Sequence, residues 1–186
     1  MWQRPYHTRS TDPSDKLLRA AALNAYSPTP KALEGYSYVP ALSTSETVTY
    51  VNPRTRQAIV AFRGTKTSAD LYTDARLSVG KLRSTARYQR SVDALHTAAT
   101  TLRGYDVYTT GHSLGGSLAE AIAHPRVRGT VSFNPGHGID GLFRKQRSRS
   151  YVNTAGPVSY LGRRNSLSSY YRSGYVLGAR SAAPRK

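Results

Sequence analysis

The 186-residue sequence predicts a single α/β domain that has a mainly parallel sheet with helices on both faces. Segments with strand character alternate along the chain with segments of helical periodicity, and this order is typical of parallel sheets. Residues 58–62 are apolar without interruption, as expected for a strand that is covered on both faces. A glycine-rich turn at 111–116 then connects a strand directly to a helix.

The individual elements follow from local patterns. Strands are expected where β-branched and aromatic residues lie between turn-forming residues. Helices are expected where apolar residues recur at three- and four-residue steps, as Val92, Leu95 and Ala99 do. The first helix is expected to begin near Asp12, with Pro13 at its first position. The expected strands are 46–51, 57–62, 105–110, 127–133 and 150–153, and the expected later helices are 82–102 and 114–123.

The domain is expected to span residues 11–178, between an irregular N-terminal arm at 1–10 and a basic C-terminal tail at 179–186. Residues 66–80 are expected to form a loop or a short helix. No apolar run approaches the roughly 20 residues that a membrane-spanning helix needs. The chain contains no cysteine, which excludes disulfides, cysteine catalysis and thiolate metal sites. Nothing in the sequence predicts a cofactor or a metal.

Charge is the strongest compositional feature. The formal net charge is +17 at pH 7, and residues 141–186 contain ten Arg or Lys and no Asp or Glu. Such a field attracts polyanions, so we expect an acidic partner: a nucleic acid backbone, an acidic membrane surface or an acidic protein neighbour in an assembly. The alternative is a solvated basic surface without a dedicated partner. Because no base-reading motif is present, only non-specific phosphate binding is predicted for nucleic acid.

The segment 111–115, Gly-His-Ser-Leu-Gly, lies at the predicted junction of strand and helix. A serine at this place stands on a sharp, strained turn whose neighbours must lack side chains. Its hydroxyl would lie at a helix N-terminus, where backbone N–H groups favour a developing negative charge. Ser113 is therefore the candidate nucleophile, and the Leu114 N–H is a candidate oxyanion donor. The competing interpretation is a glycine-rich turn with an incidental serine.

Together with the segments 58–65 (AIVAFRGT) and 132–136 (SFNPG), this motif resembles the class 3, or fungal-type, lipases. The resemblance covers roughly residues 36–171 and implies an α/β-hydrolase fold with carboxylic ester hydrolase activity. It also implies that Thr65 supplies the second oxyanion donor and that Asp70 and Asp74 occupy the acidic positions that follow. Leu71 stands where these lipases usually have a tryptophan. The resemblance further implies that His112 points away from the nucleophile.

The resemblance breaks down at two positions of the triad. The family's acid opens an Asp-Pro-Val segment, and here Gly156 precedes Pro-Val; its histidine opens His-Ser-Leu, and here Asn165 precedes Ser-Leu. No carboxylate side chain follows Asp140 and no histidine follows His137, so no downstream residue can take either role in the family's chain order. Because a serine hydroxyl is a poor nucleophile without a base, impaired catalysis is expected.

His137 is the remaining candidate base, because it follows a predicted strand and such loops face the site of an α/β sheet. Asp140 or another carboxylate could orient it, and a surface-loop histidine is the competing interpretation. The favoured function is a pseudoenzyme: a basic structural or binding protein, as in the particle of a large DNA virus, where small lipase-like chains look at home. The alternatives are an active serine esterase that uses Ser113 and His137, or a non-specific nucleic-acid-binding protein. Without a recognisable secretory signal, we expect the protein inside a cell or a virus particle.

Overall fold

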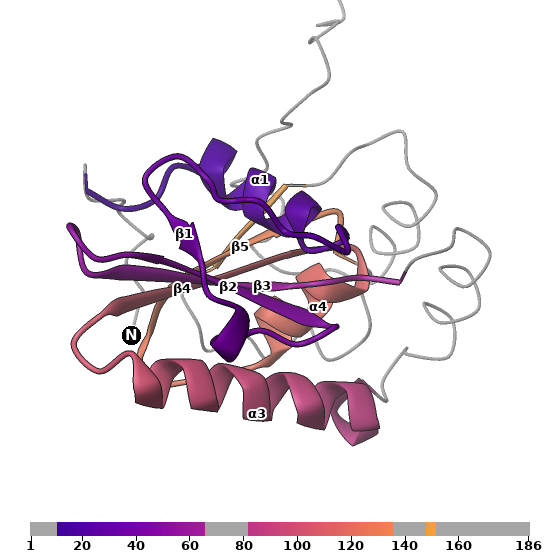
Figure 1. Cartoon of the computed structure of the whole chain (residues 1–186). Coiled ribbons are helices and arrows are strands. Elements are labelled where there is room, and N and C mark those ends of the chain that lie inside the picture. The colour runs from indigo at the N-terminus through magenta and orange to yellow at the C-terminus, as the bar shows by residue number, and fades with distance from the viewer. Residues whose placement is uncertain (1–10, 66–81, 136–147, 152–186) are drawn as a thin grey trace, which may run out of the picture.

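A six-stranded sheet forms the centre of the computed structural model, which describes residues 11–65, 82–135 and 148–151 (Figure 1). The strands follow one another across the sheet in chain order. The first strand pairs antiparallel with the second, and the second pairs antiparallel with the third. The third to the sixth strands are parallel to one another. They are β1 (Ser37–Tyr38), β2 (Thr47–Asn52), β3 (Gln57–Phe62), β4 (Asp106–His112), β5 (Val127–Phe133) and β6 (Ser148–Tyr151). The predicted mainly parallel sheet is confirmed.

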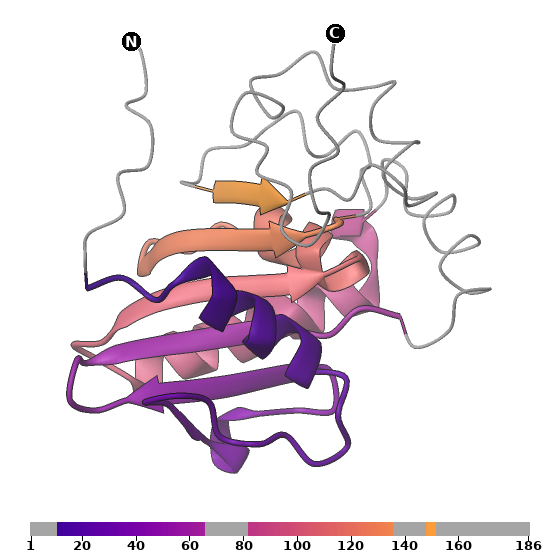
Figure 2. The ribbon, with the colours of Figure 1, turned by 90° about the horizontal axis from the view of Figure 1, so that it is seen from above.

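Helices cover both faces of this sheet (Figures 1 and 2). On one face lies α1 (Asp15–Asn24), and on the other lie α3 (Ala86–Thr101) and α4 (Leu114–Ala121). Every residue of β3 is buried, because its side chains alternate between the two layers. Ile59 and Ala61 pack toward α1, and Val60 and Phe62 pack toward α3 and α4. The prediction of a strand covered on both faces is confirmed.

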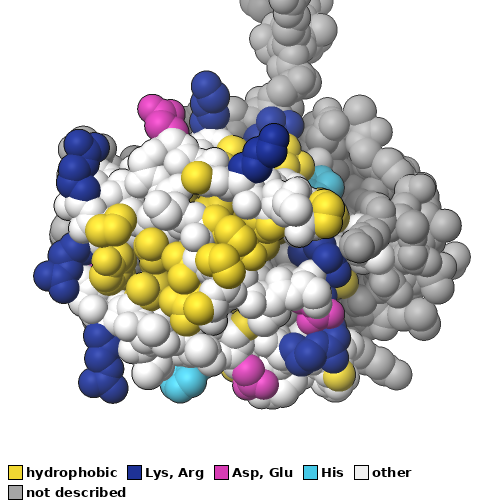
Figure 3. Space-filling view, in the orientation of Figure 1, with side chains coloured by type: hydrophobic (Ala, Val, Ile, Leu, Met, Phe, Trp, Pro, Cys, Tyr) yellow, Lys and Arg dark blue, Asp and Glu magenta, His cyan; other side chains and the backbone are white. Residues whose placement is uncertain are grey.

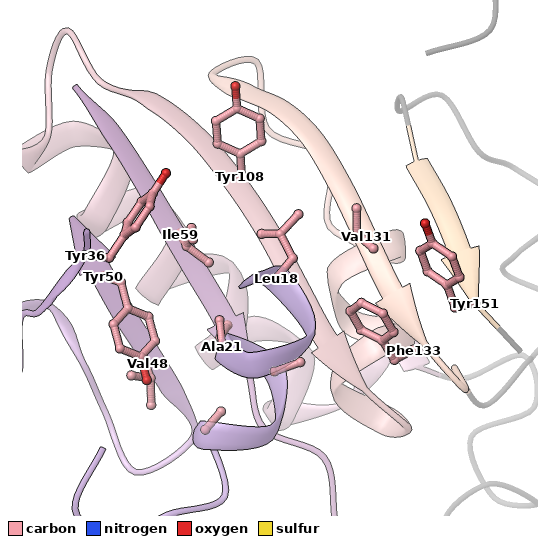
Figure 4. Close-up of a cluster of buried hydrophobic side chains, with 13 residues drawn as sticks. Leu18, Ala21, Tyr36, Val48, Tyr50, Ile59, Tyr108, Val131, Phe133 and Tyr151 are labelled. Carbon is pink, nitrogen blue, oxygen red and sulfur yellow. The ribbon is translucent and has the colours of Figure 1, made fainter. Parts of the chain in front are cut away.

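The core on the α1 side is rich in aromatic rings (Figure 4). Leu18 and Ala21 of α1 belong to one cluster with rings and aliphatic side chains that come from every strand of the sheet. Phe133 and Tyr151 stack with their centroids 5.4 Å apart, which joins β5 to the last described strand. This core therefore reaches the carboxyl ends of the parallel strands, where the predicted site lies.

Carboxylates hold β6 to the domain from both layers. From α1, Asp15 pairs with Arg149 and accepts a hydrogen bond from the Tyr151 hydroxyl. From α4, Glu120 accepts hydrogen bonds from the hydroxyls of Ser132 on β5 and Ser150 on β6. These contacts fix the strand that leads toward the expected position of the triad acid.

Several predicted boundaries are wrong, because side-chain caps start the helices later than expected. Ser14 caps α1 by accepting a hydrogen bond from the Leu17 N–H at 3.2 Å, so Pro13 precedes the cap rather than starting the helix. Thr85 caps α3 by accepting from the Tyr88 N–H at 3.1 Å, and residues 82–84 form a separate 3₁₀ turn. A second 3₁₀ turn, Pro40–Leu42, was not predicted.

The strand and helix ends near the site also differ from the predictions. The strand β4 extends to His112, α4 ends at Ala121 and β6 begins at Ser148. The two-residue β1 was not predicted. The expected loop or short helix at 66–80, the N-terminal arm and the C-terminal tail lie outside the described residues. In the part of the chain that is described, no helix has the length and apolar character needed to cross a bilayer.

Candidate active site

Ser113 occupies a strained turn between the end of β4 and the start of α4. Its backbone angles are φ 56° and ψ −127°, a conformation that costs a non-glycine residue about 1–3 kcal/mol. Two hydrogen bonds hold it there: the Ser113 N–H donates to the Phe133 carbonyl at 3.0 Å, and the Ser117 N–H donates to the Ser113 carbonyl at 3.1 Å. The neighbouring strand and the first turn of α4 thus maintain the strained conformation.

The two outer glycines of the motif allow this turn to lie against the sheet. A Cβ atom on Gly111 would lie 2.2 Å from the Gly115 carbonyl oxygen. A Cβ atom on Gly115 would lie 2.1 Å from the Phe62 carbonyl oxygen. Since both obstacles are backbone atoms, neither position can accept a side chain without displacing α4 from the sheet. The close approach of α4 to β3 and β4 therefore explains the glycine spacing.

The Ser113 hydroxyl is buried, and the residue is 4% exposed. Its Oγ has no hydrogen-bond partner among the described residues, and it does not cap α4. The His112 ring is directed to Tyr26, with Nδ1 3.2 Å from the phenol oxygen. Burial lowers the pKa of His112, and the Arg19 charge lowers it further, so this ring is neutral near pH 7. Its bond to Tyr26 agrees with the expected orientation away from Ser113.

The other two described histidines, His96 and His124, contact each other and lie outside the 111–115 motif. His96 of α3 and His124, which follows α4, meet edge to face with centroids 5.8 Å apart. The Arg126 N–H donates to Nδ1 of His124 at 3.2 Å. Both rings therefore join the α4–β5 connection to α3. Within residues 11–65, 82–135 and 148–151, no histidine is hydrogen-bonded to Ser113.

Thr65 lies just beyond β3, beside the strand that carries Ser113, because Phe62 pairs in register with Gly111. Hydrogen bonds and an ion pair that involve Arg87 of α3 and Glu46, just before β2, fix the turn that leads from β3 to Thr65. Arg87 donates to the Arg63 carbonyl at 2.6 Å and pairs with Glu46 at 2.5 Å, while the Arg63 N–H donates to the Glu46 carbonyl at 3.0 Å. The Thr65 Oγ1 is buried and has no hydrogen-bond partner in the described part of the chain.

Tyr26 connects the two loops that carry the predicted oxyanion donors. Its hydroxyl donates to the His112 carbonyl at 3.2 Å and forms a further hydrogen bond with the Gly64 backbone. The fit is close, since a Cβ atom on Gly64 would lie 2.2 Å from the phenol oxygen. Burial raises the pKa of Tyr26, which keeps the phenol protonated as a donor. Sequence reasoning missed Tyr26, because no motif links it to residues 86 positions away.

The remaining predicted site residues lie outside the described residues. These are the candidate base His137, the degenerate triad positions Gly156 and Asn165, and the acidic residues Asp70 and Asp74. The roles of Ser113, Leu114 and Thr65 stay predictions, because the structure places these residues without a bound ligand. Among the described residues no group of three or more His, Asp or Glu side chains is arranged to hold a metal ion.

The sheet order, the two helical layers and the strained serine turn define a lipase-like α/β-hydrolase. The model of the Tle-like phospholipase domain, a phospholipase-like family, matches residues 6–178, and the chain therefore belongs to that family. No curated protein matches the sequence.

Solved structures that are similar to this chain include two lipases. One is the Lip2 lipase from Yarrowia lipolytica, with a TM-score of 0.52 and 14% identity over 80% of this chain and 72% of that one. The other is a triacylglycerol lipase from Penicillium expansum, with a TM-score of 0.44 and 16% identity over 74% of this chain and 68% of that one. The likeness to Lip2 confirms the lipase-like fold that the sequence predicted.

Proposed function

We propose that this chain is a phospholipase-like protein that binds acyl esters at Ser113 but hydrolyses them inefficiently or not at all. One observation carries the proposal: the Ser113 Oγ is buried on a formed elbow and has no hydrogen-bond partner among the described residues. Among the described residues, no base is therefore hydrogen-bonded to this hydroxyl to remove its proton. The sequence supports the same proposal, because Gly156 and Asn165 stand where the resemblance requires an acid and a histidine.

The loss of the base is expected to lower the rate of hydrolysis by a large factor. Enzymes stripped of their triad retain on the order of 10³–10⁴-fold acceleration over water, which comes from binding and oxyanion stabilisation. The elbow and the Arg63-Gly64-Thr65 turn can supply that part, because both are fixed by hydrogen bonds. Asn165 can accept a hydrogen bond but cannot take up a proton near neutral pH. Binding without efficient turnover is therefore the expected behaviour.

The test is ester hydrolysis by the purified full chain, with short-chain p-nitrophenyl esters and with phospholipid vesicles as substrates. We expect rates barely above those of Ser113→Ala. A Ser113-dependent turnover of ordinary enzymatic size, on the order of 10 s⁻¹, would overturn the proposal.

In this proposal the protein acts as a basic binding or structural component, inside a cell or a virus particle. The net charge of +17 supports an acidic partner, and Lys and Arg side chains lie around the edge of the face shown in Figure 3. Binding to duplex DNA or heparin should weaken linearly on logarithmic axes as salt rises, with a slope near −0.9 per DNA phosphate neutralised. The measurement compares the full chain with one truncated after Gly178. A sharp preference for one DNA sequence would contradict this electrostatic account.

The second candidate function is an active serine esterase in which His137 is the base. The position of Pro135 favours it: a Cβ atom on Gly116, in the first turn of α4, would lie 3.2 Å from the Cβ of Pro135. The described chain thus lies against the first turn of α4 at Pro135, two residues before His137 in the sequence.

A His137→Ala variant separates the two candidates. If His137 is the base, His137→Ala should abolish the Ser113-dependent activity, whereas His124→Ala should leave it intact. If the first proposal holds, neither variant changes the small residual rate.

A further inference from the structure

We propose that a surface at the amino-terminal ends of the parallel strands binds the phosphate backbone of a nucleic acid duplex. This surface, which we call the arginine surface, consists of four exposed side chains: Arg54, Arg56, Arg103 and Arg126. The inference deepens the acidic-partner part of the proposed function and rests on it. It concerns the end of β4 opposite to Ser113, so it assigns no ligand to the serine turn.

Three connections that are distant in the sequence meet at these strand ends. The turn 53–56 leads into β3, the connection 102–105 leads into β4, and the connection 122–126 leads into β5. The strands start level with one another, because Gln57 pairs with Asp106 and β4 pairs in parallel with β5. Figure 1 shows the turn between β2 and β3 at the same end of the sheet as the connection from α3 to β4.

Close contacts join these connections. The Asp106 N–H donates to the Arg56 carbonyl at 2.8 Å. A Cβ atom on Gly104 would lie 2.5 Å from Nη2 of Arg56, so this glycine leaves room for the guanidinium beside the connection from α3 to β4. Arg126 donates to the Ala99 carbonyl at 3.2 Å, which places its guanidinium at the last turn of α3. Exposed arginines from three segments therefore form one surface.

The backbone at Arg56 is strained. Its φ of 52° lies in the left-handed region that favours glycine. Residues held in such conformations cluster at functional sites. Glycine would adopt this turn without strain, but it would supply no guanidinium. An arginine at this position therefore agrees with a role for its side chain.

The fold does not neutralise the charges of the arginine surface. Arg149, which holds β6 to α1, is paired with Asp15. At the strand ends, the carboxylate of Asp106 is paired with Arg128. None of the four arginines forms an ion pair with another described residue. Lys and Arg side chains also line the left end of the described surface in Figure 3, so this end of the domain attracts polyanions.

The chemistry of the surface favours the phosphates of a nucleic acid over a lipid bilayer. All four side chains are arginines, whose planar guanidinium donates two parallel hydrogen bonds to one phosphate. Binding to a bilayer requires exposed apolar side chains next to the charges. Among the described residues the exposed large hydrophobic side chain is Leu23, which lies on α1 and not at these strand ends. Phosphate contacts position a protein on a duplex without reading its sequence, which fits a chain without a base-reading motif.

The experiment compares two triple variants of the full chain that remove the same charge from different places. The first removes arginines of the proposed surface: Arg54→Gln, Arg56→Gly and Arg103→Gln. The matched control removes exposed charges elsewhere: Arg19→Gln, Lys31→Gln and Arg83→Gln. Arg83 precedes α3, whereas Arg103 follows it, so the two variants change opposite ends of this helix.

Anisotropy of labelled duplex DNA, measured from low to near-physiological salt, gives the slope of log affinity against log salt. We expect the first variant to reduce that slope by about 2.7, because three phosphate contacts are lost at about 0.9 each. The control should reduce it by less than about 1. The double variant Arg54→Gln with Arg103→Gln leaves the strained turn unchanged, and it should reduce the slope by about 1.8.

Equal reductions in the two triple variants would overturn the inference, since binding would then depend on net charge alone. An unchanged slope in the first variant would also overturn it and assign DNA binding to another part of the chain. Loss of binding to phosphatidylserine vesicles with unchanged DNA binding would overturn it in favour of a lipid surface. Ser113→Ala should bind DNA as the wild type does. Rapid Ser113-dependent ester hydrolysis would therefore refute the proposed function without changing these slopes, and the two failures are distinguishable.

Discussion

Replacing Tyr26 by phenylalanine removes one oxygen atom that joins the Ser113 turn to the turn at Arg63, Gly64 and Thr65. That oxygen donates to the His112 carbonyl at 3.2 Å and is hydrogen-bonded with the Gly64 backbone. The variant leaves these partly buried backbone groups without their partner, which costs about 1–3 kcal/mol. The bond to His112 is long, so we expect the lower part of this range, about 1–2 kcal/mol. For a chain of this size the corresponding decrease in Tm is about 2–8 °C.

The assay is urea unfolding followed by far-UV circular dichroism, with Tyr38→Phe as the matched control. Tyr38 is also half-buried, but its ring packs against Tyr50 on the antiparallel side of the sheet, with centroids 6.2 Å apart. The reasoning is refuted if the two variants lose equal stability.

Three further predictions address the turn, the triad and the pH dependence. Gly115→Ala should prevent folding or lower the free energy of unfolding by several kcal/mol, since its Cβ would lie 2.1 Å from the Phe62 carbonyl oxygen; urea unfolding measures this. Gly156→Asp combined with Asn165→His should raise Ser113-dependent esterase activity, although neither single change should, because triad members act as a unit. Stability should decrease as the pH falls below about 6.5, the pKa of an unfolded-state histidine, because burial lowers the pKa of both His112 and His124 in the folded state and the unfolded chain then binds protons preferentially. His124→Gln should reduce that decrease, and the share of His112 should remain, in thermal unfolding measured from pH 8 to pH 5.

Local patterns in the sequence were sufficient for the central strands and for the elbow. The uninterrupted apolar run at 58–62 indicated burial on both faces, and the structure buries all of β3. The glycines at 111 and 115 indicated a sharp turn around Ser113 with no room for neighbouring side chains, and in the structure a Cβ atom at either position would meet backbone atoms. Both features are encoded within a few residues, so no knowledge of distant contacts was needed.

The features that were missed depend on contacts between distant segments. Tyr26 meets His112 across 86 residues, and Arg87 reaches the Arg63 carbonyl across 24. Neither residue has a local pattern that sets it apart from an ordinary surface side chain. The two-residue strand β1 is too short to show alternation, and it exists because β2 provides its hydrogen-bond partners.

The central claim is that Ser113 lies on a formed elbow without a base that activates it. Labelling with a fluorophosphonate probe, followed by intact-mass spectrometry, tests this claim most directly, because the probe reacts with activated serine hydroxyls. The account predicts slow or undetectable labelling of the folded full chain, close to the result for Ser113→Ala. Rapid, stoichiometric labelling at Ser113 would contradict it and would show that a group in the folded chain activates this serine.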